Sequence, residues 1–358
     1  MEINSVFFRI TLKGNGIVNF DSNEQKSTLI YKCNVPFPRK SDKTFVDSVK
    51  LGKKNFYMDE DGNVTYKPKI SANCLRHEIF KVIQHSGITR RELECCDYLS
   101  RIPVLLRGWM LTYRSDTPIN HASGIRMGSA EVINGAQPVL EVGTTCGDKT
   151  FSETSMFYTE TMGETLYECR GAIDFKALEF LSCDPIFNRI AFKEDWIKGE
   201  APTLNTMFQN RYGRVPYKAG YFMPVDTSLN ETFAEQGIKF DTDFVKEMIR
   251  EFFMRVLSLR IAKAGGYAET VKLEIKRVTD AVRQTLTSPD GWEEVTIDNL
   301  DSMLNFIPKS YYVEVPEDKV QACKERFEQI CQELDKKKQD KAAKAEEGKT
   351  RSSKKTQK

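Results

Sequence analysis

Lysine and arginine lie close to aromatic or polar residues at four places in the chain. Arginine and lysine neutralise phosphates, and aromatic rings stack on bases or wedge between them. The four places are residues 36–45, residues 71–77, the loops around Arg114, Arg126 and Lys149–Phe151, and residues 211–218. The second place begins a predicted helix, whose amino end carries unpaired N–H groups that favour a phosphate. These residue types together are suited to binding a nucleic-acid strand.

Each feature also has an ordinary structural explanation. A basic side chain such as Arg76 on a helix usually only faces solvent. A polar residue such as Ser71 or Asn73 at a helix start is more often a simple cap. Phenylalanine and tyrosine in a long insertion often fill a small local core. The four places therefore make a binding surface only if the fold brings them together, which the sequence leaves open.

Catalytic and metal sites have weaker support. The nine cysteines include no C-x-x-C pair, and the adjacent Cys95 and Cys96 would diverge by roughly 100° on a helix. The three histidines have no familiar zinc spacing, and the usual enzyme signatures are absent. Acidic residues after the first strand, among them Asp21 and Asp42, keep acid–base or metal-dependent hydrolysis open, although their spacing is not distinctive. We expect no catalytic residue, metal or cofactor.

The composition is that of a folded protein without a global positive field. Hydrophobic residues make up 40% and charged residues 29% of the 358, which supports a sizeable core. The chain has 53 Lys and Arg against 51 Asp and Glu. Residues 335–358 hold ten of the basic and four of the acidic residues. Residues 1–334 therefore hold 43 basic and 47 acidic residues, a net charge of −4. A nucleic acid would therefore need a local basic groove. No apolar run reaches the roughly 18 residues that span a bilayer, and the N-terminus lacks a signal-peptide pattern, so we expect a soluble, cytoplasmic protein.

Hydrophobic periodicity predicts the elements that must position these residues. Segments with a strand-like pattern are residues 5–13, 101–113, 138–145, 155–161, 164–173, 269–278 and 311–315. Segments with an apolar stripe at helical spacing are residues 71–87, 242–264 and 317 to about 338. Met162-Gly163 suits a tight hairpin between two of the strands. Residues 114–129 are expected to form a loop that holds Arg126, and residues 187–239 a long irregular region.

Reduced to its long elements, the chain reads strand, helix, two strands, helix, strand. This βαββαβ order is typical of a ferredoxin-like or RRM-like α+β fold, in which two helices cover one face of an antiparallel sheet. Two long insertions interrupt it, at about residues 14–70 and 175–240. We therefore expect one such domain over residues 1–334, followed by a basic, disordered tail at residues 335–358.

An RRM-like sheet usually binds RNA through exposed aromatic residues on its open face. Residues 170–175 read Arg-Gly-Ala-Ile-Asp-Phe, which begins like the RNP1 motif but lacks its aromatic positions. If RNA binds, we expect it to bind away from the sheet face.

Three stretches resemble the RAMP-superfamily backbone subunit of Cascade-like CRISPR effector complexes. Residues 70–80, Ile-Ser-Ala-Asn-Cys-Leu-Arg-His-Glu-Ile-Phe, are similar to the first helix of that family and its Ser/Asn-rich start. Residues 143–161 are similar to its strand, thumb loop and strand. The long helix that precedes Gly265-Gly266 and a strand is the third likeness. Within the family the chain is most similar to type IV systems, with type I-D and type I-F variants next.

The resemblance implies a hand-like protein of antiviral defence, with an RRM-like palm, fingers made of the insertions, and a thumb loop. Copies would stack head to tail into a helical filament along a CRISPR guide RNA, beside other subunits of the complex. The guide would pair with target nucleic acid, while the protein would read the RNA backbone and catalyse nothing. No membrane partner is implied.

The resemblance also assigns RNA contacts by position. The expected RNA-binding residues are Arg39 and Lys40 in the first insertion, Ser71, Asn73, Arg76 and His77 at the first helix, Arg126 and Met127 in a loop, Thr145, Lys149 and Phe151 in the thumb, and Arg211, Arg214 and Lys218 in the second insertion. Two alternatives stay open. Some relatives cut RNA with an aspartate in the first insertion, so one alternative is a RAMP-type endoribonuclease that acts on guide precursor or target RNA. The other is a protein-only interaction module.

Overall fold

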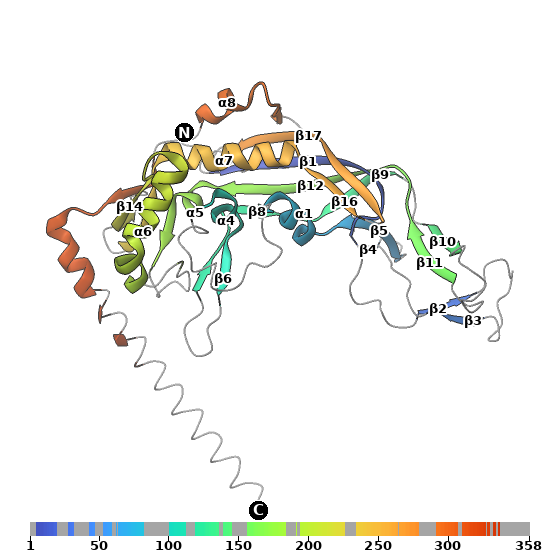
Figure 1. Cartoon of the computed structure of the whole chain (residues 1–358), viewed down its shortest axis with the longest axis horizontal. Helices are drawn as coiled ribbons and strands as arrows, with labels where there is room; N and C mark the ends of the chain where they lie inside the picture. Colours follow the sequence, from blue (N-terminus) through green and yellow to red (C-terminus); the bar gives the residue numbers. More distant parts are fainter. Residues whose placement is uncertain are drawn as a thin grey trace, which may run out of the picture.

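The computed structural model shows a long, curled antiparallel sheet that carries helices on one face (Figure 1). The structure describes residues 5–19, 28–31, 43–46, 53–58, 62, 64–81, 100–111, 119–135, 139–144, 156–183, 191, 194–225, 234–263, 265–278, 291–306, 310–326, 328–329, 332–333 and 336. None of the helices in these ranges is long and apolar enough to cross a membrane.

The main sheet has nine strands within the described ranges, and its neighbouring strands are antiparallel. Its order is β16 (Arg260–Lys263), β17 (Gly266–Val278), β1 (Ser5–Gly16), β12 (Thr165–Asp174), β9 (Ala130–Gly135), β5 (Val64–Ile70) and β4 (Lys54–Met58). Two short strands lie off this path, β18 (Glu293–Glu294) beside β17 and β8 (Ile125–Met127) beside β12. The first strand of the chain therefore lies in the interior of the sheet, between β17 and β12.

The other described strands form smaller sheets beside the main one. A four-stranded sheet has the order β13 (Phe180–Ser182), β15 (Glu235–Phe240), β14 (Tyr217–Pro224) and β19 (Tyr312–Glu314). The two-stranded sheets are β2 (Thr28–Tyr31) with β3 (Lys43–Val46), β6 (Trp109–Leu111) with β7 (Ile119–His121), and β10 (Val139–Thr144) with β11 (Met156–Thr161).

The helices differ in length and in how their ends are fixed. The labelled ones are α1 (Ala72–Ile79), α4 (Ile102–Arg107), α5 (Phe175–Glu179), α6 (Glu194–Tyr212), α7 (Thr242–Leu257) and α8 (Leu300–Met303), with the 3-10 turn η6 (Leu304–Phe306). Residues 317–326 are also helical, within the helix predicted from residue 317. Helix α7 is capped by Asp241, whose carboxylate accepts a hydrogen bond from the N–H of Phe244 at 2.7 Å. This cap satisfies an amide that the helix itself leaves unpaired.

Figure 1 shows these parts as an arch. The main sheet forms its top, α6 and the β6–β7 pair descend at one end, and the β10–β11 and β2–β3 pairs descend at the other. Helices α1 and α4 lie near the middle, on the side toward which the two ends bend. We call this the concave side.

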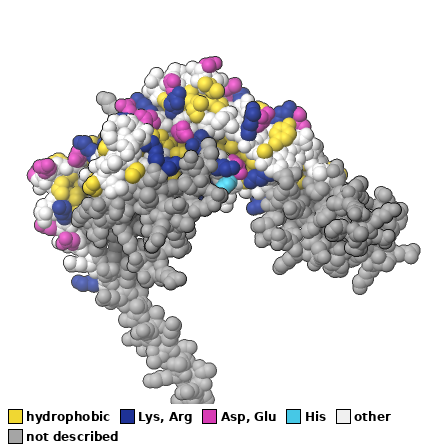
Figure 2. Space-filling model, viewed as in Figure 1, with side chains coloured by type: hydrophobic (Ala, Val, Ile, Leu, Met, Phe, Trp, Pro, Cys, Tyr) yellow, Lys and Arg dark blue, Asp and Glu magenta, His cyan; other side chains and the backbone are white. Residues whose placement is uncertain are grey.

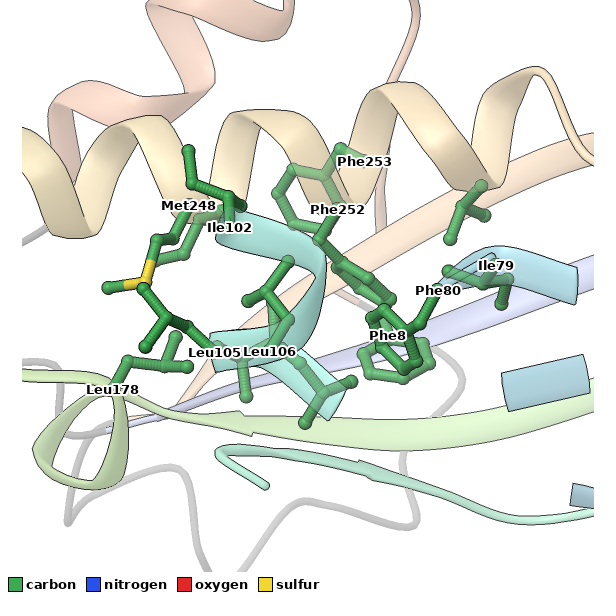
Figure 3. Packing of buried hydrophobic residues seen from close by; sticks show 14 of the residues in the cluster. Phe8, Ile79, Phe80, Ile102, Leu105, Leu106, Leu178, Met248, Phe252 and Phe253 are labelled. Atoms are coloured by element: carbon green, nitrogen blue, oxygen red, sulfur yellow. The ribbon is translucent and has the colours of Figure 1, made fainter. Parts of the chain in front are cut away.

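The core lies between the helices and the main sheet. Along β1 the side chains alternate between the two faces, and Phe8 is fully buried under the helices. Its ring centroid lies 5.2 Å from that of Phe252 in α7, and Phe80, directly after α1, stacks on Phe252 at 6.1 Å (Figure 3). Burying one such side chain stabilises the fold by about 1.5–3 kcal/mol. This aromatic cluster therefore holds α1 and α7 against β1.

A glycine in β12 makes room for the cluster. Gly171 lies directly opposite Phe8 in the register, and a Cβ atom at Gly171 would be 2.1 Å from Cζ of the Phe8 ring. The same Cβ would be 2.4 Å from the carbonyl oxygen of Arg126 in β8. The glycine of the RNP1-like stretch is therefore required by packing.

The α+β class is confirmed, and so are the predicted strands that correspond to β1, β10, β11, β12, β17 and β19. The strand predicted over residues 101–113 is wrong in its first half, because residues 102–107 form α4. A short apolar run that is buried on all sides has no periodicity that distinguishes a strand from a helix. Pro103 is compatible with the first turn of a helix. The predicted 242–264 helix ends at Leu257, and residues 260–263 form β16 instead.

Three further predictions are wrong. Residues 114–129 are not simply a loop, since Arg126 lies in β8. Met162-Gly163 does not close a hairpin, because β11 pairs with β10 whereas β12 pairs with β1 and β9. Residues 187–239 contain α6, β14 and β15 and are not irregular. The predicted tail lies outside the described residues apart from position 336.

Candidate nucleic-acid interface

The exposed face of α1 carries two of the polar residues predicted to bind phosphate. Asn73 and His77 lie one helical turn apart, so they share a face, and both are exposed. Ser71 is the cap of this helix, since its Oγ accepts a hydrogen bond from the N–H of Cys74 at 3.3 Å. The capping role of Ser71 is therefore certain from the geometry, and its phosphate contact stays a prediction.

Two other N–H groups at the start of α1 are also paired. The amide of Ser71 donates to Oδ1 of Asn19 at 2.6 Å, and the amide of Ala72 donates to Oγ of Ser129 at 3.3 Å. A phosphate at this end would have to displace these partners. The side chains of α1, and not its amide groups, are consequently the better candidates for RNA contacts.

Arg76 ties α1 to two neighbouring elements. Its Nη1 donates to the carbonyl oxygen of Ile125 in β8 at 2.8 Å, and its Nη2 donates to the carbonyl oxygen of Arg107 in α4 at 2.6 Å. The guanidinium also lies 5.4 Å from the centroid of the Phe80 ring. Burial, and secondly the positive charge of Arg107, lower the pKa of Arg76, although an arginine stays charged at neutral pH.

Arg107 is a candidate contact that sequence reasoning missed. It is the last residue of α4, its side chain is exposed, and no acceptor pairs with its guanidinium within the described ranges. The prediction of a strand over residues 101–113 hid it, because the helix end was not recognised. Its position before Gly108, whose φ of +73° ends the helix, was the available signal.

Lysines continue the basic surface beside α1. Lys81 and Lys263 have their Nζ atoms 3.8 Å and 3.3 Å from the carboxylate of Glu78, which neutralises part of their charge. Lys53 is near enough to lower the pKa of Cys74, although burial of this thiol raises the pKa by more. Figure 2 shows lysine and arginine side chains along the concave edge of the described surface. Basic side chains therefore gather locally beside α1 and α4 among the described residues.

Arg126 lies on the face of the main sheet that the helices do not cover. It is opposite Ala172 in the register, and its neighbour Ile125 is buried under the helices. Because successive side chains of a strand point to opposite faces, the Arg126 side chain points away from the helices. Its Nη2 is 3.5 Å from Oδ2 of Asp174. Met127 points back and packs partly buried against the core. The structure thus brings the backbone of β8 to Arg76, but not the Arg126 side chain.

Arg214 is held by two carboxylates at the start of α7. Its Nη1 lies 2.6 Å from Oδ2 of Asp241 and its Nη2 lies 2.8 Å from Oε1 of Glu247. The hydrogen bond with Glu247, followed by the charge of Asp241, outweighs partial burial and raises the pKa of Arg214. This arginine fastens the turn after α6 to α7, and a phosphate would have to compete with both carboxylates.

The two other basic residues of the second insertion are also engaged. Lys218 is exposed and its Nζ lies 3.3 Å from Oε2 of Glu314 in β19. Arg211, at the end of α6, donates to the hydroxyl of Ser100 just before α4. Arg211 therefore joins α6 to the segment that leads into α4.

Ion pairs occupy the uncovered face of the main sheet. The ladder crosses β12, β1 and β17 through Arg170, Glu168, Arg9, Glu274 and Lys272, with successive N–O distances of 2.6, 3.9, 2.8 and 2.9 Å. Burial alone would raise the pKa of Glu274, but hydrogen bonds from Lys272 and Arg9 lower it overall. Charges that already satisfy one another favour an RNA site away from this face.

Residues 2–288 match the model of the family described as type I-Fv CRISPR-associated protein, Cas7fv-like. The chain belongs to this family. The membership agrees with the resemblance to CRISPR backbone subunits, but the type IV assignment is not supported, because the Cas7fv-like family is of type I-F.

Solved structures similar to this Cas7fv-like chain show low identity. One, titled CRISPR RNA-guided surveillance complex, is 11% identical with a TM-score of 0.37, and the match covers 92% of this chain and 83% of the other. Another, titled CRISPR RNA-guided surveillance complex, pre-nicking, is 10% identical with a TM-score of 0.35, covering 92% and 87%. A comparison with curated proteins finds no match.

Several predicted sites of this Cas7fv-like chain lie outside the described residues. They are the contacts Arg39, Lys40, Thr145, Lys149 and Phe151, and the alternative catalytic residues Asp21 and Asp42. The roles assigned to them stay predictions. Within the ranges that the structure describes, no three His, Cys, Asp or Glu side chains are grouped so that they could hold a metal ion.

Proposed function

We propose that this Cas7fv-like protein is a non-catalytic backbone subunit that binds CRISPR guide RNA along its concave side and presents it to target nucleic acid. The observation that carries the proposal is the basic cluster of Arg76 and Arg107 beside the exposed face of α1, in a chain of a CRISPR-associated family. Phosphate contacts of this kind hold a backbone and leave sequence choice to base pairing.

The strand order supports an RRM-like palm as the frame of this site. The run β17-β1-β12-β9 is antiparallel throughout, α1 follows β1 in the chain, and α7 stands between β12 and β17. On this proposal residues 1–334 form the palm, the insertions at about 14–70 and 175–240 form the fingers, and the β10–β11 pair is the root of the thumb. Residues 335–358 would be a basic tail.

Copies of the chain would stack head to tail on one RNA, in contact with other subunits of the complex. An interface of this kind joins two different surfaces and does not close, so it builds a helical filament. Each copy would then add its own Arg76 and Arg107 cluster to one continuous track. A chain with an excess of acidic residues over positions 1–334 would bind RNA in this way through a local group of basic side chains.

Size-exclusion chromatography of the protein expressed together with a guide RNA tests the proposal. We expect a particle whose absorbance ratio shows bound nucleic acid and whose size grows with the length of the RNA. A particle free of nucleic acid, unchanged by added RNA at low salt, would refute the proposal. Labelled RNA incubated with the same particle and a divalent metal should stay intact; cleavage that is lost on Asp21→Ala or Asp42→Ala would instead support the ribonuclease.

A further inference from the structure

Two arginines meet on the concave side without a carboxylate between them. Arg76 donates to the carbonyl oxygen of Arg107 at 2.6 Å, so the two residues are in direct contact. Arg107 is exposed, and its guanidinium has no acceptor in the described part of the chain. Four other exposed arginines pair with carboxylates: Arg126 with Asp174, Arg170 with Glu168, Arg250 with Asp301, and Arg260 with Glu269. Exposed Arg211 instead donates to the hydroxyl of Ser100. Arg76 and Arg107 therefore differ from these four arginines in that no carboxylate of the described residues neutralises them.

We propose that Arg107 binds a phosphate of the RNA and that Arg76 is the positioning residue that holds it in place. The inference rests on the proposed function and adds the residue that makes the contact. A phosphodiester bound by Arg107 would offset the repulsion between the two guanidinium groups. A guanidinium presents a rigid, planar set of donors that matches two phosphate oxygens at once. Arg107 has this whole set available, because no protein group in the described part of the chain uses it.

Arg76 has the geometry of a support. Two of its nitrogens already donate hydrogen bonds to the carbonyl oxygens of Ile125 and Arg107, and its guanidinium packs over Phe80. These contacts join α1, β8 and α4. Because the carbonyl of Arg107 is one of the two acceptors, Arg76 fixes the backbone from which the Arg107 side chain extends.

The turn after α4 is equally constrained. Gly108 has a φ of +73°, and a Cβ atom there would lie 2.4 Å from the carbonyl oxygen of His121 and 2.7 Å from the amide nitrogen of Ser123. The chain thus turns sharply at the end of α4, and the position of Arg107 is set by packing on both sides. Asn73 and His77 extend the same surface along α1 and offer further side-chain donors to neighbouring phosphates.

Binding of a short single-stranded RNA of fixed length, measured by fluorescence anisotropy at several salt concentrations, tests the assignment. We expect Arg107→Ala to weaken binding roughly tenfold at moderate salt. The slope of log affinity against log salt should become shallower by about 0.7, the value for one phosphate on a single strand. The melting temperature should not change, and Arg107→Lys should restore the slope. The matched control is Arg170→Ala, which removes the same charge from the uncovered face and should leave affinity and slope unchanged.

The outcomes separate the two proposals. If the native chain shows a steep salt slope and Arg107→Ala keeps that slope and affinity, the assignment of Arg107 is wrong while the proposed function stands. If the native chain has no salt slope, the proposed function itself fails. Arg76→Ala should weaken binding in the native background but add little in the Arg107→Ala background, because Arg76 acts through Arg107. Additive losses would show that Arg76 contacts RNA directly and overturn its positioning role.

Discussion

Gly171→Ala is a test of how the aromatic core fixes β8 beside the proposed RNA site. The added Cβ would lie 2.1 Å from Phe8 Cζ and 2.4 Å from the carbonyl oxygen of Arg126. The Phe8 ring cannot swing aside, because it is fully buried against Phe252 at 5.2 Å. Overpacking of this kind costs about 1–3 kcal/mol. We expect the upper part of this range, since one of the two obstacles is backbone.

Urea unfolding followed by circular dichroism measures this cost. Gly220→Ala is the matched control, because a Cβ there meets only the Phe222 ring at an ordinary 3.7 Å, and we expect a change within about 0.5 kcal/mol. In a Phe8→Leu background the cost of Gly171→Ala should fall by about 1 kcal/mol, since the ring edge is gone and the Arg126 contact remains. A Gly171→Ala protein as stable as the native one, or an equal cost in both backgrounds, would show that the reasoning from close approach is wrong.

Two other perturbations have clear expected outcomes. Arg214→Ala should lower the free energy of unfolding by about 1 kcal/mol, because its ion pairs with Asp241 and Glu247 are partly exposed, and should leave the RNA salt slope unchanged; a shallower slope would show that Arg214 binds phosphate after all. His121 is buried, with Nε2 3.2 Å from the Leu105 carbonyl oxygen, and burial lowers its pKa from 6.5 to about 4. The unfolded chain therefore takes up this proton at a higher pH than the folded chain, so stability should fall by up to about 3 kcal/mol from pH 6.5 toward 4. His121→Gln should remove that part of the pH dependence in unfolding curves, and an unchanged curve would contradict the assignment.

Burial patterns that repeat over several turns or residues were predictable from the sequence. The alternation along β1 and the apolar stripe of α7 each follow from one face being buried, and a local pattern is sufficient to show that. Shorter or interrupted patterns were not. The stripe of α6 includes Leu204 and Phe208, both buried, but Pro202 within the same helix breaks the pattern that would have revealed it.

The site was predictable only in part, because pairing across the fold decides which charges are free. Arg76 and His77 were named as candidates from the residues of α1, and α1 lies on the concave side, but their RNA contacts stay predictions. Arg214 looked equally available in the sequence, but its two carboxylate partners lie 27 and 33 residues further along the chain. Arg107 looked like part of a strand, and only the end of α4 shows its exposed position.

The salt dependence of RNA binding by the native chain tests the central claim most directly. If each copy neutralises about five phosphates, log affinity should fall with log salt with a slope of roughly −3 to −4, and should do so for RNAs of different sequence. A slope near zero, or a slope that depends on the sequence of the RNA, would contradict a protein that holds its guide by the phosphate backbone.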